Sequence, residues 1–268
     1  MPPSLWQLRI QRADELSRQH PYAKEILTFY IHLARFQETL HRDLKATLQS
    51  PHPTLDRELT DSELSELAPR FQKFLAVPET HGPQPLSQLA RDLNSQTEAH
   101  RRDLLSDSWL AHSASDAPHL LAQAFLQPYA ELLRSRATPR THPYAHALCP
   151  FCNRKPVCGI LRPMGDGAAR SLLCSFCLSE WQFPRIACPG CGDQNDKSLV
   201  VFTATEPDSN LEHIRVNCCE TCKTYLKTID LTKNGHADPL VDELASAPLD
   251  LWAAEHHYAK LQRNSLGM

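Results

Sequence analysis

Cysteine is the residue type whose number and spacing predict chemistry most clearly in this chain. Eight of the ten cysteines form four Cys-x-x-Cys pairs, and these are Cys149/Cys152, Cys174/Cys177, Cys188/Cys191 and Cys219/Cys222. Two intervening residues allow one tight turn to direct both sulfurs at a single ion about 2.3 Å away. Two such turns complete a tetrahedron, so the eight cysteines predict two metal ions, each held by four thiolates.

The segments between the pairs predict which turns share an ion. Residues 157–161 and 170–173 are rich in strand-forming side chains and flank a turn at residues 164–167. The same plan recurs at residues 198–203 and 211–217. We therefore expect two tandem ribbon-like modules in which consecutive pairs share an ion, with crossed pairing of the turns as the alternative.

Disulfides and a thioredoxin-type redox site are the other uses of such cysteines. The N-terminal residues lack the apolar segment of a secretory signal, and thiols in the cytoplasm stay reduced. Four pairs exceed the single pair of a redox site, and no βαβ pattern surrounds them. Metal ligation is therefore favoured.

Zinc and rubredoxin-type iron both suit four thiolates, so the identity of the metal stays open. Rubredoxin turns often place glycine after the second cysteine, where the backbone adopts a positive φ. Gly192 fits this pattern and Asn153 is the next best residue, whereas Leu178 and Lys223 do not fit it.

Nothing else in the sequence predicts catalysis. There is no nucleophile elbow, dinucleotide fingerprint, P-loop or HExxH motif. Four-cysteine sites also leave no open position on the metal for substrate or water. We therefore expect a protein that is not an enzyme, with no catalytic residue and no small-molecule substrate.

The remaining candidate ligands have simpler interpretations, because eight thiolates already fill two tetrahedra. The two unpaired cysteines are expected to be small apolar side chains. The histidines nearest the cysteine region and the C-terminus are expected to be bystanders. These residues are Cys158, Cys218, His142, His146, His256 and His257.

The charge balance disfavours a nucleic-acid partner. The formal net charge is −3, and two divalent four-thiolate sites would bring it to about −7. Nucleic-acid affinity depends mainly on contacts between cations and phosphates. A nucleic-acid-binding zinc ribbon stays an alternative because Arg154, Lys155, Arg162 and Arg170 cluster on the first predicted hairpin.

The first 148 residues have no cysteine and predict helices. Apolar side chains recur every three or four residues in the segment 22–44, and Pro51 and Pro53 end that helix. Thr60 and Glu63 have the spacing of a capping box that begins the next helix. Further helical stretches are expected at residues 86–112 and 118–136, the second kinked at Pro128.

These patterns together predict an α+β protein. A mainly helical domain, residues 1–140, is followed by two rubredoxin-like or zinc-ribbon modules and C-terminal helices. Residues 137–146 contain two prolines and no apolar periodicity, as expected of a connector. No segment has the apolar length of a membrane span, so no membrane insertion is expected. The expected modules cover residues 141–184 and 185–235, and the C-terminal helical segment covers residues 236–268.

The cysteine region resembles the formate dehydrogenase accessory protein family, which is FdhE-like. The resemblance rests on CPFCNRKP from Cys149, LLCSFCLSEWQFPRIACPGC from Leu172 and CETCKTYLKTID from Cys219. It extends through the acidic, leucine-rich segment 238–261. This chain has Gln182 where histidine is expected in relatives.

The resemblance implies a cytoplasmic, non-enzymatic assembly factor that binds the catalytic subunit of a respiratory formate dehydrogenase. It also implies rubredoxin-like modules with iron as a serious candidate for the metal. The main alternative is an electron carrier that acts on the same client enzyme through a one-electron iron couple.

Overall fold

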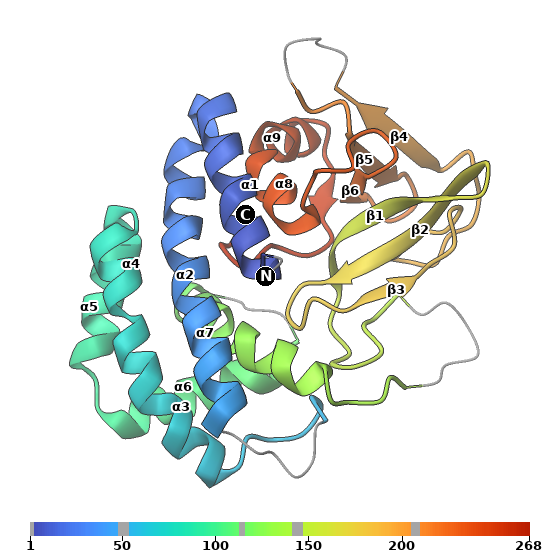
Figure 1. The fold of residues 1–268 in the computed structure, drawn as a ribbon. Coiled ribbons are helices and arrows are strands. Elements are labelled where there is room, and N and C mark those ends of the chain that lie inside the picture. Colours follow the sequence, from blue (N-terminus) through green and yellow to red (C-terminus); the bar gives the residue numbers. More distant parts are fainter. Residues whose placement is uncertain (1–2, 48–53, 113–115, 141–146, 205–209) are drawn as a thin grey trace.

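A helical half lies beside a twisted sheet in the computed structural model (Figure 1). The structure describes residues 3–47, 54–112, 116–140, 147–204 and 210–268. The helix α8 (Pro239–Ala245) lies between α1 (Leu5–Gln19) and the sheet and contacts both. The predicted α+β architecture is therefore confirmed. None of the described helices has the length and hydrophobicity of a membrane span.

The helical half is built from α-helices and one short 3-10 helix. These elements are α1 (Leu5–Gln19), η1 (Pro21–Ala23), α2 (Lys24–Thr47), α3 (Asp61–Phe74), α4 (Ala76–His81), α5 (Gln84–Ser95), α6 (Glu98–Leu110) and α7 (Ala117–Arg134). The predicted capping box begins α3, because Thr60 Oγ1 accepts from the Glu63 N–H and Glu63 Oε2 accepts from the Thr60 N–H at 2.8 Å.

The helices after residue 84 differ in part from the prediction. The expected single stretch 86–112 is two helices, because Thr97 accepts a hydrogen bond from the His100 N–H and caps the start of α6. The helix α7 continues through Pro128 to Arg134. Pro51, Pro53 and most of the predicted connector lie outside the described residues.

The strands form one sheet in the described residues, with the order β3-β2-β1-β6-β5-β4 and β7 beside β6. The two predicted hairpins are confirmed as the antiparallel pairs β1–β2 and β4–β5. Most of the expected turn of the second hairpin lies outside the described residues. The strands are β1 (Pro156–Met164), β2 (Gly167–Cys174), β3 (Glu180–Gln182), β4 (Leu199–Thr203), β5 (Ile214–Cys219), β6 (Thr224–Asp230) and β7 (Ala259–Lys260).

The two ribbon modules share this sheet through the parallel pairing of β1 with β6. Gly159 lies opposite Thr228 at the junction, and a Cβ atom on Gly159 would lie only 2.5 Å from the Thr228 Oγ1. Glycine therefore permits the close approach of the two strands. The boundary expected between residues 184 and 185 lies in the loop between β3 and β4.

The main apolar core joins the N-terminal helices, α8 (Pro239–Ala245) and the first module. Three smaller clusters lie in the second module, at its junction with the first module, and against α9 (Ala247–Glu255). One of them includes the contact of Phe202 with Trp252, whose rings lie 4.6 Å apart. The first module is thus part of the main core, whereas the second module extends from it.

Candidate metal centres

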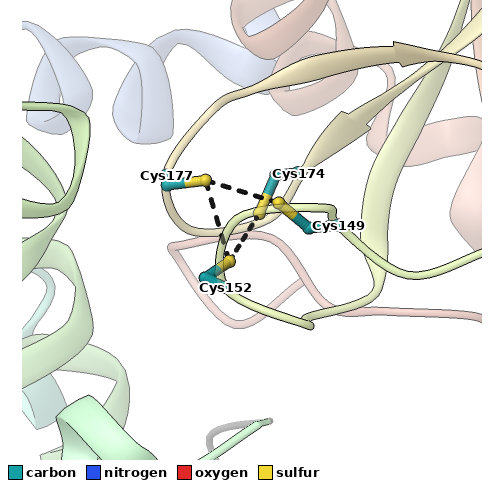
Figure 2. A group of neighbouring side chains, drawn as sticks. All are labelled: Cys149, Cys152, Cys174 and Cys177. Carbon is teal, nitrogen blue, oxygen red and sulfur yellow. Dashed lines mark hydrogen bonds between the residues drawn. The ribbon is translucent and has the colours of Figure 1, made fainter. Parts of the chain in front are cut away.

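The first group consists of Cys149, Cys152, Cys174 and Cys177, whose side chains converge on one point (Figure 2). The first two lie in the loop before β1, and the others lie at and just after the end of β2. Sulfur atoms are 3.5 Å apart for Cys149 and Cys177 and 3.3 Å apart for Cys152 and Cys174. All four side chains are buried.

The second group consists of Cys188, Cys191, Cys219 and Cys222, from the loop before β4 and the turn between β5 and β6. The sulfur of Cys188 lies 3.6 Å from that of Cys222, and the sulfur of Cys191 lies 3.7 Å from that of Cys219. Cys191 is exposed and Cys222 is half-buried. All eight predicted ligands thus meet in consecutive, uncrossed groups.

The spacing of the sulfurs fits a tetrahedral metal site. A metal–sulfur distance of about 2.3 Å places the four sulfurs about 3.8 Å apart. The closest sulfur pairs of both groups are slightly shorter than this edge, and within each group all four atoms lie within 4.8 Å of one another. Each group can therefore accept one metal ion without a change of fold. The identity of the ion is not specified by four thiolates.

All four Cys-x-x-Cys turns have the same backbone conformation after the second cysteine. The φ angles are 59° at Asn153, 50° at Leu178, 79° at Gly192 and 54° at Lys223. The left-handed conformation was expected only at Gly192 and Asn153, because leucine and lysine disfavour it. The turn geometry overrides residue preference at the other two positions.

Backbone N–H groups point at the sulfurs inside these turns. The N–H groups of Phe151, Phe176 and Gly190 donate to Cys149, Cys174 and Cys188 at 3.3–3.4 Å. Such donors stabilise thiolates and orient them toward a metal.

Burial and hydrogen bonding set the pKa values of the thiols without metal. Burial raises the pKa of Cys174 and Cys177 well above its usual range. Burial also opposes ionisation of Cys222, but the hydroxyl and N–H groups of Thr224 outweigh it and lower its pKa to about 7. A metal ion would hold all four sulfurs of a group as thiolates.

A buried arginine lies beside each group. The Arg154 guanidinium lies 3.5 Å from the centre of the Phe176 ring, and its Nη2 donates to the carbonyls of Ser108 and Trp109 at 2.9 Å. Burial lowers the pKa of Arg154, although all four sulfurs of the first group attract its charge. Burial likewise lowers the pKa of Arg170, although the sulfur of Cys188 in the second group attracts its charge. Each arginine is a counter-charge for a four-thiolate site.

The sequence suggested a basic surface on the first hairpin, but the structure does not have one among the described residues. Arg154 and Arg170 are buried, and Arg162 pairs with Glu180 at 2.8 Å. Of these four residues, only Lys155 is exposed and forms no ion pair with a carboxylate of the described residues. The first hairpin therefore presents no cluster of free cations to a phosphate backbone.

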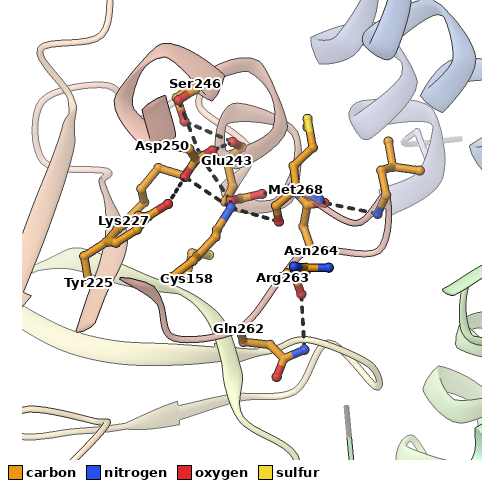
Figure 3. Close-up of polar contacts among 12 residues, drawn as sticks. Cys158, Tyr225, Lys227, Glu243, Ser246, Asp250, Gln262, Arg263, Asn264 and Met268 are labelled. Carbon is orange, nitrogen blue, oxygen red and sulfur yellow. Dashed lines mark hydrogen bonds and ion pairs between the residues drawn. The ribbon is translucent and has the colours of Figure 1, made fainter. Parts of the chain in front are cut away.

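The unpaired cysteines are buried, as expected of small apolar side chains. Cys158 lies beneath α8, where its sulfur contacts the carbonyl of Pro239 at 3.7 Å, beside the buried pair of Lys227 and Glu243 (Figure 3). Burial raises the pKa of Cys158, and it raises the pKa of Cys218 to about 12. Neither thiol is poised to react.

The candidate histidines are not part of the two groups where they are described. The Nδ1–H of His256 donates to the Trp252 carbonyl at 2.8 Å, and His257 is exposed. His142 and His146 lie outside the described residues.

Known proteins match this chain over the cysteine region and beyond. Residues 148–185 match the family model of the FdhE central domain, and residues 186–266 match that of the FdhE C-terminal domain. An FdhE homolog from Aquifex aeolicus is 27% identical over 272 residues, covering 96% of this chain and 94% of the relative. An FdhE homolog from Pseudomonas aeruginosa is 33% identical over 123 residues, or 46% of this chain and 40% of the relative.

A solved structure extends the match to the helical half. The crystal structure of the FdhE protein from Pseudomonas aeruginosa superposes with a TM-score of 0.74 and 25% identity, covering 99% of this chain and 97% of that one. Its coverage includes both the helices and the sheet that carries the two cysteine groups. The chain is therefore similar to FdhE proteins in sequence and in fold over nearly its whole length.

Proposed function

We propose that the chain is an assembly factor for a respiratory formate dehydrogenase and binds the catalytic subunit of that enzyme in the cytoplasm. The observation that carries the proposal is the pair of closed four-cysteine groups within an FdhE-like fold. Four protein ligands saturate a tetrahedral ion, so the groups support a binding surface better than hydrolysis. The family resemblance supplies the client.

In this proposal the eight cysteines of the two groups hold two metal ions, and iron or zinc is the candidate. Bound metal would supply folding free energy to modules that bury little apolar surface of their own. The N–H donors of Phe151, Phe176 and Gly190 orient the sulfurs, and Arg154 and Arg170 offset their charge. The protein thus offers the client a preformed surface.

Copurification and gene deletion test the proposal together. We expect the tagged chain to recover the catalytic subunit of formate dehydrogenase from the cytoplasmic fraction. We also expect deletion to abolish formate oxidation without lowering synthesis of that subunit. Recovery of no such subunit, together with unchanged formate oxidation after deletion, would contradict the proposal.

Electron transfer to the client is the second candidate, and the exposure of Cys191 favours it. An iron ion held next to an exposed sulfur could exchange one electron with a docked protein, whereas the first group is enclosed. Protein purified without oxygen decides between the candidates. Iron that is reduced and reoxidised reversibly supports electron transfer, and protein that contains only zinc removes it.

A further inference from the structure

A cavity lies beside the second cysteine group. Its volume is about 470 Å³, and Cys188 and Cys219 form part of its wall. The segment that joins the two modules borders it with Arg185 and Ile186, and Leu261 closes another side. We call this cavity the groove.

The floor of the groove is a row of three side chains across neighbouring strands. Val201 on β4 lies opposite Asn217 on β5, which lies opposite Leu226 on β6. Directly opposed residues share one face of a sheet, and consecutive residues of a strand point to opposite faces. Because Phe202 packs on Trp252 of α9, the row faces away from the C-terminal helices.

Two polar atoms at the groove are buried without a hydrogen-bond partner. They are Oδ1 of Asn217, an acceptor, and Nε of Arg170, a donor. Arg170 is 93% buried, and its Nη1 is already committed to the carbonyls of Pro184, Arg185 and Ala187. A buried donor and acceptor left unpaired cost free energy, so they favour a ligand that carries both groups.

Two arginines and one carboxylate line the described part of the groove. Neither Arg170 nor Arg185 forms an ion pair among the described residues, and Asp196 is the single acidic side chain at the wall that the structure describes. Arg185 is exposed at the rim. Charge complementarity therefore favours an occupant with a carboxylate.

The groove opens toward a free strand edge. The strand β4 lies at the end of the sheet, and its outer edge forms no backbone hydrogen bond with the described residues. Val201 on this strand is 48% exposed, and Ile186 at the rim is 57% exposed. An open edge beside apolar side chains is the geometry to which an extended peptide adds as a further strand.

We propose that the groove and the outer edge of β4 bind an extended segment of the partner protein that carries an apolar side chain next to a carboxylate. The backbone of the segment pairs with β4, its apolar side chain covers Val201, and its carboxylate meets Arg185. This inference rests on the proposed function, because it assigns the surface on which the client docks.

Hydrogen exchange with the purified catalytic subunit of formate dehydrogenase tests the docking surface. Binding is first measured by sedimentation, and exchange is then compared with and without the subunit. We expect the amides of residues 199–203 to exchange more slowly in the complex. Binding without protection of residues 199–203 would overturn the docking surface alone, whereas no binding would overturn both this proposal and the proposed function.

Two variants and two matched controls sharpen the test. Val201→Lys places a charge in the groove and Arg185→Glu reverses the charge at its rim, and each should weaken binding about tenfold. Gln182→Lys makes the first change on β3 at the opposite edge of the sheet, and Lys197→Glu makes the second outside the groove. Both controls should bind as the parent does. Unchanged binding by Val201→Lys would contradict the proposal.

A second copy of this chain is the rival occupant of the same edge. If the chain alone sediments as a dimer and Val201→Lys disperses it, the edge pairs with another copy and the proposal is overturned. A monomer with freely exchanging amides at residues 199–203 supports the proposal.

Discussion

The two four-cysteine groups have the same turns and the same sulfur spacing, but they differ in what surrounds them. The first group lies in the main apolar core, in the same buried cluster as residues of the N-terminal helices. The second group lies where the sheet extends from that core, and Cys191 is exposed to solvent. Two similar sets of four cysteines therefore differ in burial and in the packing around them.

This difference suggests a division of labour between the groups. Phe176 lies in the Cys-x-x-Cys turn that follows β2. Its ring packs on Trp109 of α6, and Trp109 packs on Tyr129 of α7. The first group thus joins the sheet to the helices. The second group instead fixes the end of the hairpin that carries the proposed docking groove. We expect the first to support the whole fold and the second to support one surface.

The largest expected effect comes from removing one cysteine ligand from each group in turn, which should separate the two roles. Cys174→Ser should unfold the helices together with the first hairpin, because a four-cysteine site contributes on the order of 10 kcal/mol to folding. Cys191→Ser should leave the helices folded. Circular dichroism at 222 nm and thermal unfolding measure the two outcomes. Equal loss of helix in both variants would contradict the division.

Removal of the buried counter-charge should weaken the first group selectively. Arg154→Met leaves two carbonyls without their donor and the thiolates without a cation, which should cost about 3 kcal/mol. Arg162→Met is the control, since its exposed pair with Glu180 is worth less than about 1 kcal/mol. Denaturant unfolding of the metal-loaded proteins gives both values. Similar losses would argue against the counter-charge.

Protonation of Glu63 at low pH should lower the stability of the helices that pack against the first group. Burial opposes ionisation of Glu63, but Arg57, Tyr129 and the Thr60 backbone outweigh it and lower its pKa to about 2 from the usual 4.5. A lowered pKa in the folded state contributes stability above pH 4.5, and that contribution is lost as the pH falls toward 2.

Glu63→Gln should therefore cost about 2 kcal/mol at pH 7 and little near pH 2. Unfolding of the parent, Glu63→Gln and Glu66→Gln is measured across this range, with the exposed Glu66 as the control on the same helix. The three proteins should converge at low pH. A constant difference between Glu63→Gln and the parent would exclude this carboxylate as a source of the acid sensitivity.

The smallest expected effect compares one backbone position in the two groups. Leu178 and Lys223 both adopt a positive φ, so glycine relieves strain of about 1 kcal/mol at either position. Lys223 is exposed, and Lys223→Gly should stabilise the protein slightly. Leu178 is buried, and Leu178→Gly should destabilise it by about 2 kcal/mol because the lost packing exceeds the relieved strain. Denaturant melts with the same sign for both would contradict the assigned difference in burial.

Local chemistry explains which features could be predicted from the sequence. The capping box at Thr60, the two hairpins and the consecutive grouping of the cysteines all depend on residues close in sequence. The break at Thr97 was missed, although a threonine at a possible helix start is a signal that could have found it.

The features that could not be predicted depend on contacts between distant segments. The parallel pairing of β1 with β6 joins strands about seventy residues apart, and only Gly159 at the junction carries any trace of it. The burial of Arg154 depends on its packing against α6, so its sequence neighbours suggested a basic surface instead. The unequal exposure of the two cysteine groups has the same origin, because the turns themselves are alike.

Metal release from the intact protein tests the inequality of the two groups most directly. Protein loaded with two ions is mixed with excess chelator, and released metal and hydrogen exchange are followed together. We expect two phases that release one ion each. The faster phase opens residues 199–204 and 210–219 and is absent from Cys191→Ser, whereas residues 156–174 open only in the slower phase. A single phase, or a fast phase that opens residues 156–174, would contradict the account.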